Sequence, residues 1–203
     1  MPAQFKTPYY VAQGISALGI VWNSKSGTPK PTDWTDLAQP VLSGASLDLL
    51  LGLQNAKQEA AWTLFSELKA NGMVISGPNA QALTPVLQGA KAAVFGAVDY
   101  VAYGSIAEGE SIEVIFPSSG TAIAPRPMMI LNSSKQQNED KAFIDYVLSP
   151  EGQKIVADAW LMPARTDVAG KRPDFSTLTL LPEPTTDSAE RSSVLSRFSG
   201  IFR

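Results

Sequence analysis

The stretch VIFPSSGTAIAPRPMMIL, residues 114–131, joins two apolar runs through a loop that is poor in charge and rich in hydroxyl groups. The first run, residues 114–116, has the composition of a β-strand and stops at Pro117, and the second run is residues 128–131. The loop between them carries many backbone N–H and hydroxyl donors. This composition fits a plain flexible turn, and it also fits a surface that meets a polar molecule.

Short apolar runs alternate with helix-like segments on both sides of this stretch. Strands are predicted at residues 15–22, 73–75, 92–98, 112–116 and 128–131. Helices are predicted to begin at capping residues, namely Ser43 or Ser46, Asn79, Asp99, Ser149 and Asp187, and a further helix ends at Asn71-Gly72. This alternation predicts an α/β fold with a mainly parallel sheet flanked by helices.

Composition excludes several classes of protein. The 203 residues suffice for one large domain or two small ones, and no apolar run approaches the roughly 18 residues of a membrane helix. The net charge of −3 argues against a nucleic-acid partner, which usually meets a basic surface. The chain has no Cys and no His, so thiol catalysis, thiolate metal sites and a Ser-His-Asp hydrolase are excluded.

An enzyme would have to depend on carboxylates alone, for example Asp99 with Asp48 or Glu110. Glu108 and Glu110 lie around a predicted helix end, however, where charged side chains are ordinarily solvated. We therefore expect a protein that is not an enzyme and that needs neither a cofactor nor a metal ion.

Three predicted helix starts follow strands or strand-like turns, at Ser43-Gly44, at Asn79 and at Asp99-Tyr100. In α/β sheets, ligands lie beyond the carboxyl ends of strands, where helices begin. A helix N-terminus carries unpaired N–H groups and about half a unit of positive charge, so it can hold an anion without a basic residue. Each cap can equally serve only its own helix, and both interpretations stand at this point.

Five segments occur in this order along the chain: GISALGIVWN, PTDWTDLAQP, SGASLDLLLGL, AAVFGAVDYVAYGSIAEGESIEVIFPSSGTAIAPRP and KAFIDYVLSPEGQKIVADAWLMPAR. Together they resemble the solute-binding proteins of ABC importers, in the branch that includes ferric-ion, thiamine, phosphonate and sugar-phosphate binders. The resemblance implies a type 2 periplasmic binding fold, with two α/β lobes, two crossing strands and a ligand trapped in an interlobe cleft. The opening stretch then resembles the second crossover, in which Ser118, Ser119, Gly120 and Thr121 serve as hinge and cleft wall.

The resemblance also narrows the ligand class. Ferric binders of this family carry two adjacent tyrosines in the segment matching GAVDYVAYG, whereas this chain has Asp99-Tyr100, with Tyr103 three residues on. An Asp-Tyr pair is similar to members that bind phosphonates or phosphorylated organic solutes. In that reading Ser43 and Gly44 hold phosphate oxygens, Asp99 accepts hydrogen bonds from an amine or sugar hydroxyls, and Tyr100 covers the ligand. The full set of expected ligand residues is Ser43, Gly44, Asn79, Asp99, Tyr100, Ser118, Ser119, Gly120 and Thr121.

Several departures from the family shape the expected organisation. Full-length members are considerably longer, and many place an acidic residue in the loop matching PSSG, which this chain lacks. We expect residues 1–125 to form the C-terminal lobe with its crossover strands. Residues 126–203 would hold the second crossover and helices that normally pack partly on an N-terminal lobe. The helices KAFIDYVL and SSVLSRFSGIF would then expose apolar faces that favour self-association.

The resemblance predicts an extracytoplasmic receptor that delivers a small anion to an ABC permease. The N-terminus MPAQFKTPYYVAQG has no basic segment followed by an apolar core, so it does not read as a secretory signal. Three alternatives remain: a truncated remnant that binds nothing, a ferric-ion binder, and a stand-alone effector-sensing domain. Trp34 is expected to anchor packing, and Arg165 to stabilise the return of the chain or to face an anionic ligand.

Overall fold

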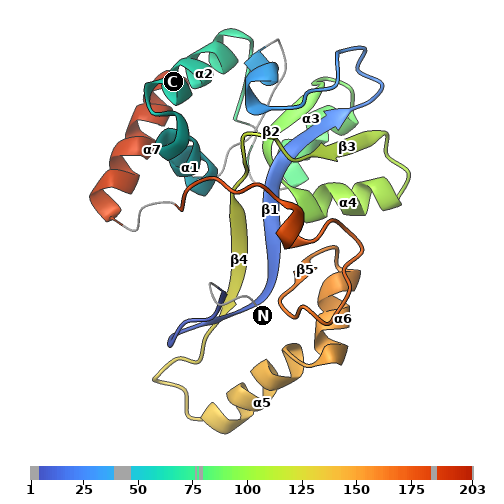
Figure 1. Cartoon of the computed structure of the whole chain (residues 1–203), viewed down its shortest axis with the longest axis vertical. Helices are drawn as coiled ribbons and strands as arrows, with labels where there is room; N and C mark the ends of the chain where they lie inside the picture. Colours follow the sequence, from blue (N-terminus) through green and yellow to red (C-terminus); the bar gives the residue numbers. More distant parts are fainter. Residues whose placement is uncertain (1–4, 39–46, 76, 78–79, 184–186, 203) are drawn as a thin grey trace. The chain divides into compact units, whose positions relative to one another are not determined.

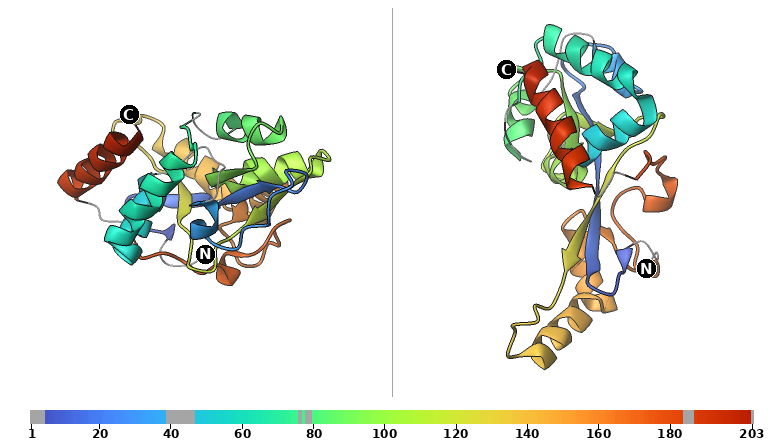
Figure 2. Two further views of the ribbon diagram at one scale, coloured as in Figure 1. Left: turned by 90° about the horizontal axis from the view of Figure 1, so that it is seen from above. Right: turned by 90° about the vertical axis from the view of Figure 1, so that its left-hand side faces the viewer.

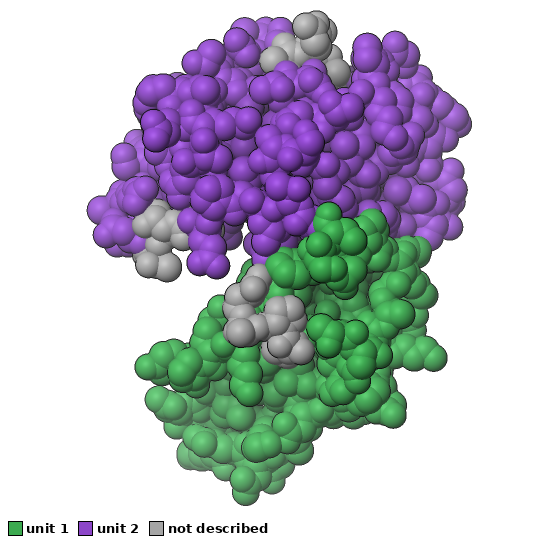
Figure 3. Space-filling model, viewed as in Figure 1, with its two compact units in different colours: residues 1–16, 124–177 green, residues 17–123, 178–203 purple. Residues whose placement is uncertain are grey.

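A computed structural model describes residues 5–38, 47–75, 77, 80–183 and 187–202 (Figure 1). The chain forms two compact units (Figure 3): unit 1 comprises residues 1–16 and 124–177, and unit 2 comprises residues 17–123 and 178–203. The chain therefore passes between the units three times, at residues 16/17, 123/124 and 177/178. Among the helices described, none combines the length and the apolar composition needed to cross a lipid bilayer.

The sheet is organised around one long strand, β1 (Val11–Asn23), whose residues from 14 to 22 are all buried. In unit 2 this strand lies between β2 (Ala93–Val98) and β3 (Ile112–Ile115), in the order β2-β1-β3. Helices flank the sheet, and the predicted α/β class is confirmed. A nearly continuous apolar strand is what burial on both faces requires.

The pairing of the strands differs from the expected mainly parallel sheet. β1 pairs antiparallel with β2, with β3 and with β5 (Met162–Pro163). β2 and β3 do run in the same direction and are joined through α4 (Asp99–Ala107), as a strand–helix–strand pattern predicts. The pattern cannot reveal that β1 lies between them and runs the opposite way, because β1 is far away in sequence.

Unit 2 contains most of the helices. These are α1 (Leu47–Lys57), α2 (Glu59–Ala70), α3 (Ala80–Leu87), α4, α7 (Ser188–Phe202) and the short 3-10 helix η2 (Trp34–Ala38). α3 and α4 pack on β2 and β3, while α7 lies alongside α1 and α2 (Figures 1 and 2). A chain of aromatic rings links these layers: the ring centroids are 4.7 Å apart for Trp34 and Phe95, 6.1 Å for Phe65 and Phe95, and 5.4 Å for Phe65 and Phe198.

Most of the apolar stripe of α7 is covered within unit 2, whereas Leu195 is 47% exposed. Val194 and Phe198 are buried against α1 and α2. The expectation that SSVLSRFSGIF would lack a partner is therefore wrong. Its partner is supplied by helices more than a hundred residues earlier in the chain, which no local pattern indicates.

Unit 1 contains the first part of β1, β4 (Ile123–Met128) from residue 124 onward, β5, α5 (Gln137–Val147), α6 (Pro150–Asp158) and η3 (Phe175–Thr177). The predicted start of α6 is confirmed, since the Ser149 hydroxyl accepts the Gly152 N–H at 3.2 Å and Pro150 opens the helix. In α5 no residue is buried, and Phe143 and Tyr146 are 64% and 54% exposed. The apolar face expected on KAFIDYVL is thus open among the described residues.

The second strand expected in the opening stretch begins earlier than predicted. It was expected at residues 128–131, whereas β4 is Ile123–Met128 and pairs with β1. Pro125 and Pro127 argued against a strand in the sequence, because proline has no N–H to donate to a neighbouring strand. A strand tolerates them where those positions do not have to donate to a neighbour.

Candidate functional site

Asp99, the first residue of α4, is completely buried, with an exposed fraction of 0%. Its Oδ2 accepts the N–H of Ala17 in β1 at 2.7 Å, and its Oδ1 accepts the N–H of Tyr100 at 2.7 Å. β1 and β2 last pair at Leu18 and Val98, one residue before this point. The Ala17 N–H lies beyond the last pair of β1 and β2, and it donates to the Asp99 carboxylate instead of to a strand. This bond fixes the first turn of α4 to β1.

Thr121 is also buried, at 1% exposure, and it ties three segments of unit 2 together. Its hydroxyl donates to the Leu18 carbonyl, and the Leu18 N–H donates to the Ala122 carbonyl at 2.9 Å. Its own N–H donates to the Thr179 carbonyl at 2.9 Å, and its carbonyl accepts the Leu181 N–H at 2.9 Å. We call this set, together with Ala17 and Asp99, the junction.

The loop PSSG is a tight turn closed by a hydrogen bond from the Gly120 N–H to the Pro117 carbonyl at 3.0 Å. Gly120 has a φ of +110°, and a Cβ there would lie 3.2 Å from the Leu180 carbonyl carbon. The Gly120 carbonyl accepts the indole N–H of Trp34 at 2.8 Å. Trp34 is fully buried, as expected of a packing anchor. Glycine at position 120 is thus a requirement of the fold.

The two serines of this turn bind a carboxylate of unit 2 itself. The Ser118 and Ser119 hydroxyls donate to Asp33 at 3.0 Å and 2.6 Å, and the Ser119 N–H donates to it at 2.9 Å. The fold thereby brings an acid to a loop that has none in sequence. Burial raises the pKa of Asp33, but hydrogen bonds from Ser119, the Trp34 N–H and Ser118 outweigh it and hold that pKa below its usual value near 3.8.

We expect Asp33→Asn to lower the free energy of unfolding at neutral pH and to matter less in acid. The folded-state pKa of Asp33 is depressed, so its contribution is fully present above the unfolded-state value of about 3.9 and is lost as pH falls through the folded value. Urea unfolding of both proteins, followed by circular dichroism between about pH 7 and pH 2.5, measures the difference. A difference that stays constant over this range would contradict the assignment.

The predicted ligand residues other than Gly120, which the turn itself requires, fall into four groups. Ser43, Gly44 and Asn79 lie outside the described residues. Asp99 and Thr121 come together, since they bind the consecutive β1 residues Ala17 and Leu18, although both side chains are directed at protein groups. Ser118 and Ser119 meet at Asp33, with Ser118 exposed. Tyr100 is half-buried on the first turn of α4, where its ring can pack while its polar tip reaches solvent.

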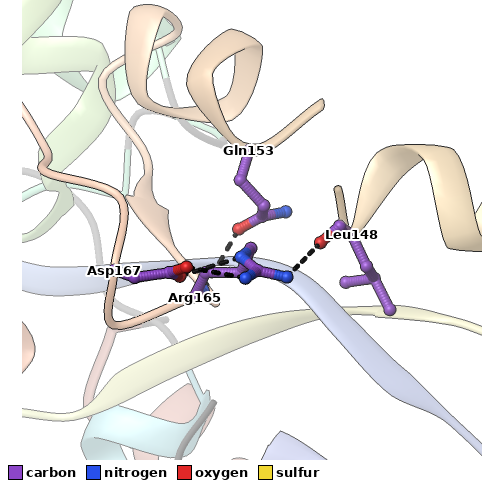
Figure 4. A network of polar contacts seen from close by, with 4 residues as sticks. All are labelled: Leu148, Gln153, Arg165 and Asp167. Carbon is purple, nitrogen blue, oxygen red and sulfur yellow. Dashed lines mark hydrogen bonds and ion pairs between the residues drawn. The ribbon is translucent and has the colours of Figure 1, made fainter. Parts of the chain in front are cut away.

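Two roles were expected for Arg165: stabilising the return of the chain, or facing an anionic ligand. The structure shows the first, within unit 1 (Figure 4). Its guanidinium donates to both carboxylate oxygens of Asp167, at 2.8 Å and 2.6 Å, and to the Leu148 carbonyl at 3.2 Å. Its fork is therefore engaged within unit 1, in the bidentate geometry that favours such pairs.

Gln153, which the sequence reasoning missed, belongs to the same network, because its side-chain oxygen accepts the Arg165 backbone N–H at 3.4 Å (Figure 4). It is completely buried; its amide nitrogen donates to the Gln13 and Val147 carbonyls at 2.7 Å and 2.9 Å, and its oxygen accepts the Ala164 N–H at 2.6 Å. Gln153 lies three positions before Val156 and therefore on the same apolar face of α6. A polar residue on an apolar helix face was the signal in the sequence that could have indicated a buried amide. Buried amides of this kind order the segments that they join.

Three surface hollows of about 570 to 670 Å³ are lined by other residues. One lies on α1, α2 and α7 of unit 2, around Trp62 and Arg197. The other two belong to unit 1, one beside Arg165 and one between α5 and the residues that follow β4. The predicted ligand residues line none of these three.

A scan against family models matches residues 1–189 to the bacterial extracellular solute-binding proteins. The chain belongs to this family, whose members bind solutes rather than catalyse reactions. A curated relative is the phosphoglycerate transport regulatory protein PgtC of Salmonella typhimurium, 28% identical over 167 residues. That alignment covers 73% of this chain and 41% of PgtC, so the chain spans less than half the length of this relative.

Solved structures confirm the fold. The substrate-binding protein of an ABC transporter from Agrobacterium tumefaciens has a TM-score of 0.85 at 16% identity, covering 100% of this chain and 70% of that one. AfuA from Actinobacillus pleuropneumoniae, solved with fructose-6-phosphate bound, has a TM-score of 0.78 at 20% identity, covering 99% and 70% of the two chains. The resemblance to this branch of periplasmic binding proteins is thereby confirmed.

Proposed function

We propose that this chain belongs to an extracytoplasmic receptor that binds a small phosphorylated organic anion and delivers it to an ABC permease. The observation that carries the proposal is the start of α4, which follows β2 directly and has no side-chain cap at Val98. The first N–H groups of a helix have no backbone partner within the helix, and its dipole favours negative charge. The Asp99 carboxylate already accepts one of them, that of Tyr100, so the anion would meet the N–H groups that follow in the first turn. Tyr100 on this turn would cover the anion and donate a hydrogen bond to it.

The two comparisons with phosphorylated compounds in their names agree with this ligand class. PgtC is named for phosphoglycerate transport, and AfuA was solved with fructose-6-phosphate bound. Ser43, Gly44 and Asn79 remain proposed contacts for the phosphate group, in keeping with helix starts that bind anions. Because the carboxylate of Asp99 already accepts two backbone N–H groups, we propose no direct ligand contact for it.

Titration with 3-phosphoglycerate and fructose 6-phosphate tests the proposal, and glycerate and fructose serve as matched controls without phosphate. We expect dissociation constants of about 1 mM or weaker, corresponding to about −4 kcal/mol or less favourable. Weak binding is expected because the contacts proposed on the described residues, the first turn of α4 and Tyr100, are few. Amide chemical shifts suit this affinity range, and Tyr100→Ala should weaken binding further.

The controls decide among the alternatives. Equal responses to the phosphorylated and unphosphorylated compounds would reject the anionic ligand class. Binding of ferric citrate in preference to either phosphate ester would identify a ferric-ion binder instead. No response to any of these probes would favour the remnant that binds nothing, and submicromolar binding would contradict the expectation that the contacts are few.

A further inference from the structure

We infer that Asp99 and Thr121 are positioning residues that lock the first turn of α4 to all three segments by which the chain leaves unit 2. The three passages lie at residues 16/17, 123/124 and 177/178. Ala17, Ala122 and Thr179, each bonded within the junction, lie within two residues of a passage. The junction itself consists entirely of unit 2 residues.

The chemistry of Asp99 fits this role better than that of a ligand contact. Its two oxygens accept N–H groups from two different elements, Ala17 of β1 and Tyr100 of α4, both at 2.7 Å. The side chain is completely buried, so water does not compete for either oxygen. A carboxylate can accept at both oxygens, whereas an amide of the same shape presents one acceptor and one donor. Asparagine would therefore leave one of the two N–H groups facing a second donor.

Thr121 holds the next residue of the same strand from another segment of unit 2. Its hydroxyl donates to the carbonyl of Leu18, the residue directly after Ala17. Its backbone bonds to Thr179 and Leu181 as part of a parallel bridge between Thr121 and Leu180. Two consecutive residues of β1 are thus tied to α4 and to the two other leaving segments. Buried networks of this kind are stiff, because each lost bond leaves an unpaired polar group.

Hydrogen exchange measured amide by amide tests the lock without any ligand. We expect Asp99→Asn to speed exchange at least tenfold at Ala17 and Tyr100. We expect the same at Thr121 and Leu181, whose N–H groups donate to the Thr179 and Thr121 carbonyls rather than to Asp99. Thr121→Val should reciprocally speed exchange at Tyr100, and Thr121→Ser should restore the natural rate. The amide of Val94 in β2, a position paired with Val21 of β1, reports global opening, so a change confined to the junction is distinguished from a general loss of stability.

Asp33→Asn is the matched control, because it makes the same carboxylate-to-amide change at another hydrogen-bonded site of unit 2. It should leave the junction amides unchanged. If each variant affects only the groups that its own side chain contacts, the lock does not exist and the inference is overturned. Should Asp99→Asn fail to fold, Thr121→Val alone decides the question through the Tyr100 amide.

A second arm rests on the proposed function. With 3-phosphoglycerate at about 20 mM, exchange should slow at Tyr100 and Leu181 of the natural chain. In the Asp99→Asn variant, the compound should slow exchange at Tyr100 alone. The dissociation constant of 3-phosphoglycerate should differ less than threefold from that of the natural chain. Slowing at Tyr100 alone in the natural chain would overturn the inference. If the compound does not bind, the proposed function fails, while the ligand-free arm still decides whether the lock is present.

Discussion

Replacing Trp34 by alanine is expected to lower the free energy of unfolding of unit 2 by about 3–5 kcal/mol. The indole ring is completely buried and packs on Phe95, with centroids 4.7 Å apart. Its N–H also donates to the Gly120 carbonyl at 2.8 Å, so its loss removes the partner of a buried acceptor in the PSSG turn. Urea unfolding followed by circular dichroism measures the change without depending on tryptophan fluorescence.

Trp34→Phe separates the two contributions. Phenylalanine keeps most of the buried ring and its contact with Phe95, but it has no N–H for Gly120. A loss of about 1–3 kcal/mol, smaller than that of alanine, is therefore expected from the unpaired carbonyl. An alanine variant within about 1 kcal/mol of the natural chain would show that the ring does not hold this core together.

Gly152→Ala is expected to destabilise unit 1 by at least about 3 kcal/mol. A Cβ at this position of α6 would lie 2.2 Å from the Tyr146 carbonyl oxygen and 2.7 Å from that of Val147. Both obstacles are backbone atoms of the last two residues of α5, so relief requires α6 to move. Such a movement would break the four hydrogen bonds of Gln153 beside it.

Gly200→Ala is the matched control, because Gly200 also lies in a helix but has no atom within 4 Å of the added Cβ. Alanine there should raise stability by about 0.5–1 kcal/mol, since it has the higher helix propensity. Two compact units need not unfold together, so limited proteolysis of α5 and α6 locates the effect of Gly152→Ala. Unchanged cleavage in these helices would contradict the expected clash.

The sequence predicted those parts of the fold that depend on neighbouring residues. The start of α6 at Ser149-Pro150 and the start of α7 at Asp187, which accepts the Glu190 N–H at 2.8 Å, are both confirmed. The helix end at Asn71-Gly72 is confirmed as well, since α2 ends at Ala70 and Gly72 has a φ of +82°. Caps and turns depend on a few consecutive residues, and their chemistry is visible in the sequence.

The orientation of the polar side chains could not be predicted in the same way. Asp99 reaches Ala17 across 82 residues, and Thr121 reaches Leu18 across 103. Whether such a side chain faces a ligand or a distant backbone group depends on strand register, which the sequence does not display. The serines of the PSSG turn pose the same problem, because their partner Asp33 lies 85 and 86 residues away.

The packing of α7 on α1 and α2 has a consequence for synthesis on the ribosome. Phe198 packs on Phe65, so the core of unit 2 stays open until residues near position 198 have emerged. Unit 1, by contrast, is complete in sequence at residue 177. The nascent chain therefore carries an unfinished unit 2, with apolar surface still exposed, until α7 has emerged, and such surface favours aggregation over that interval.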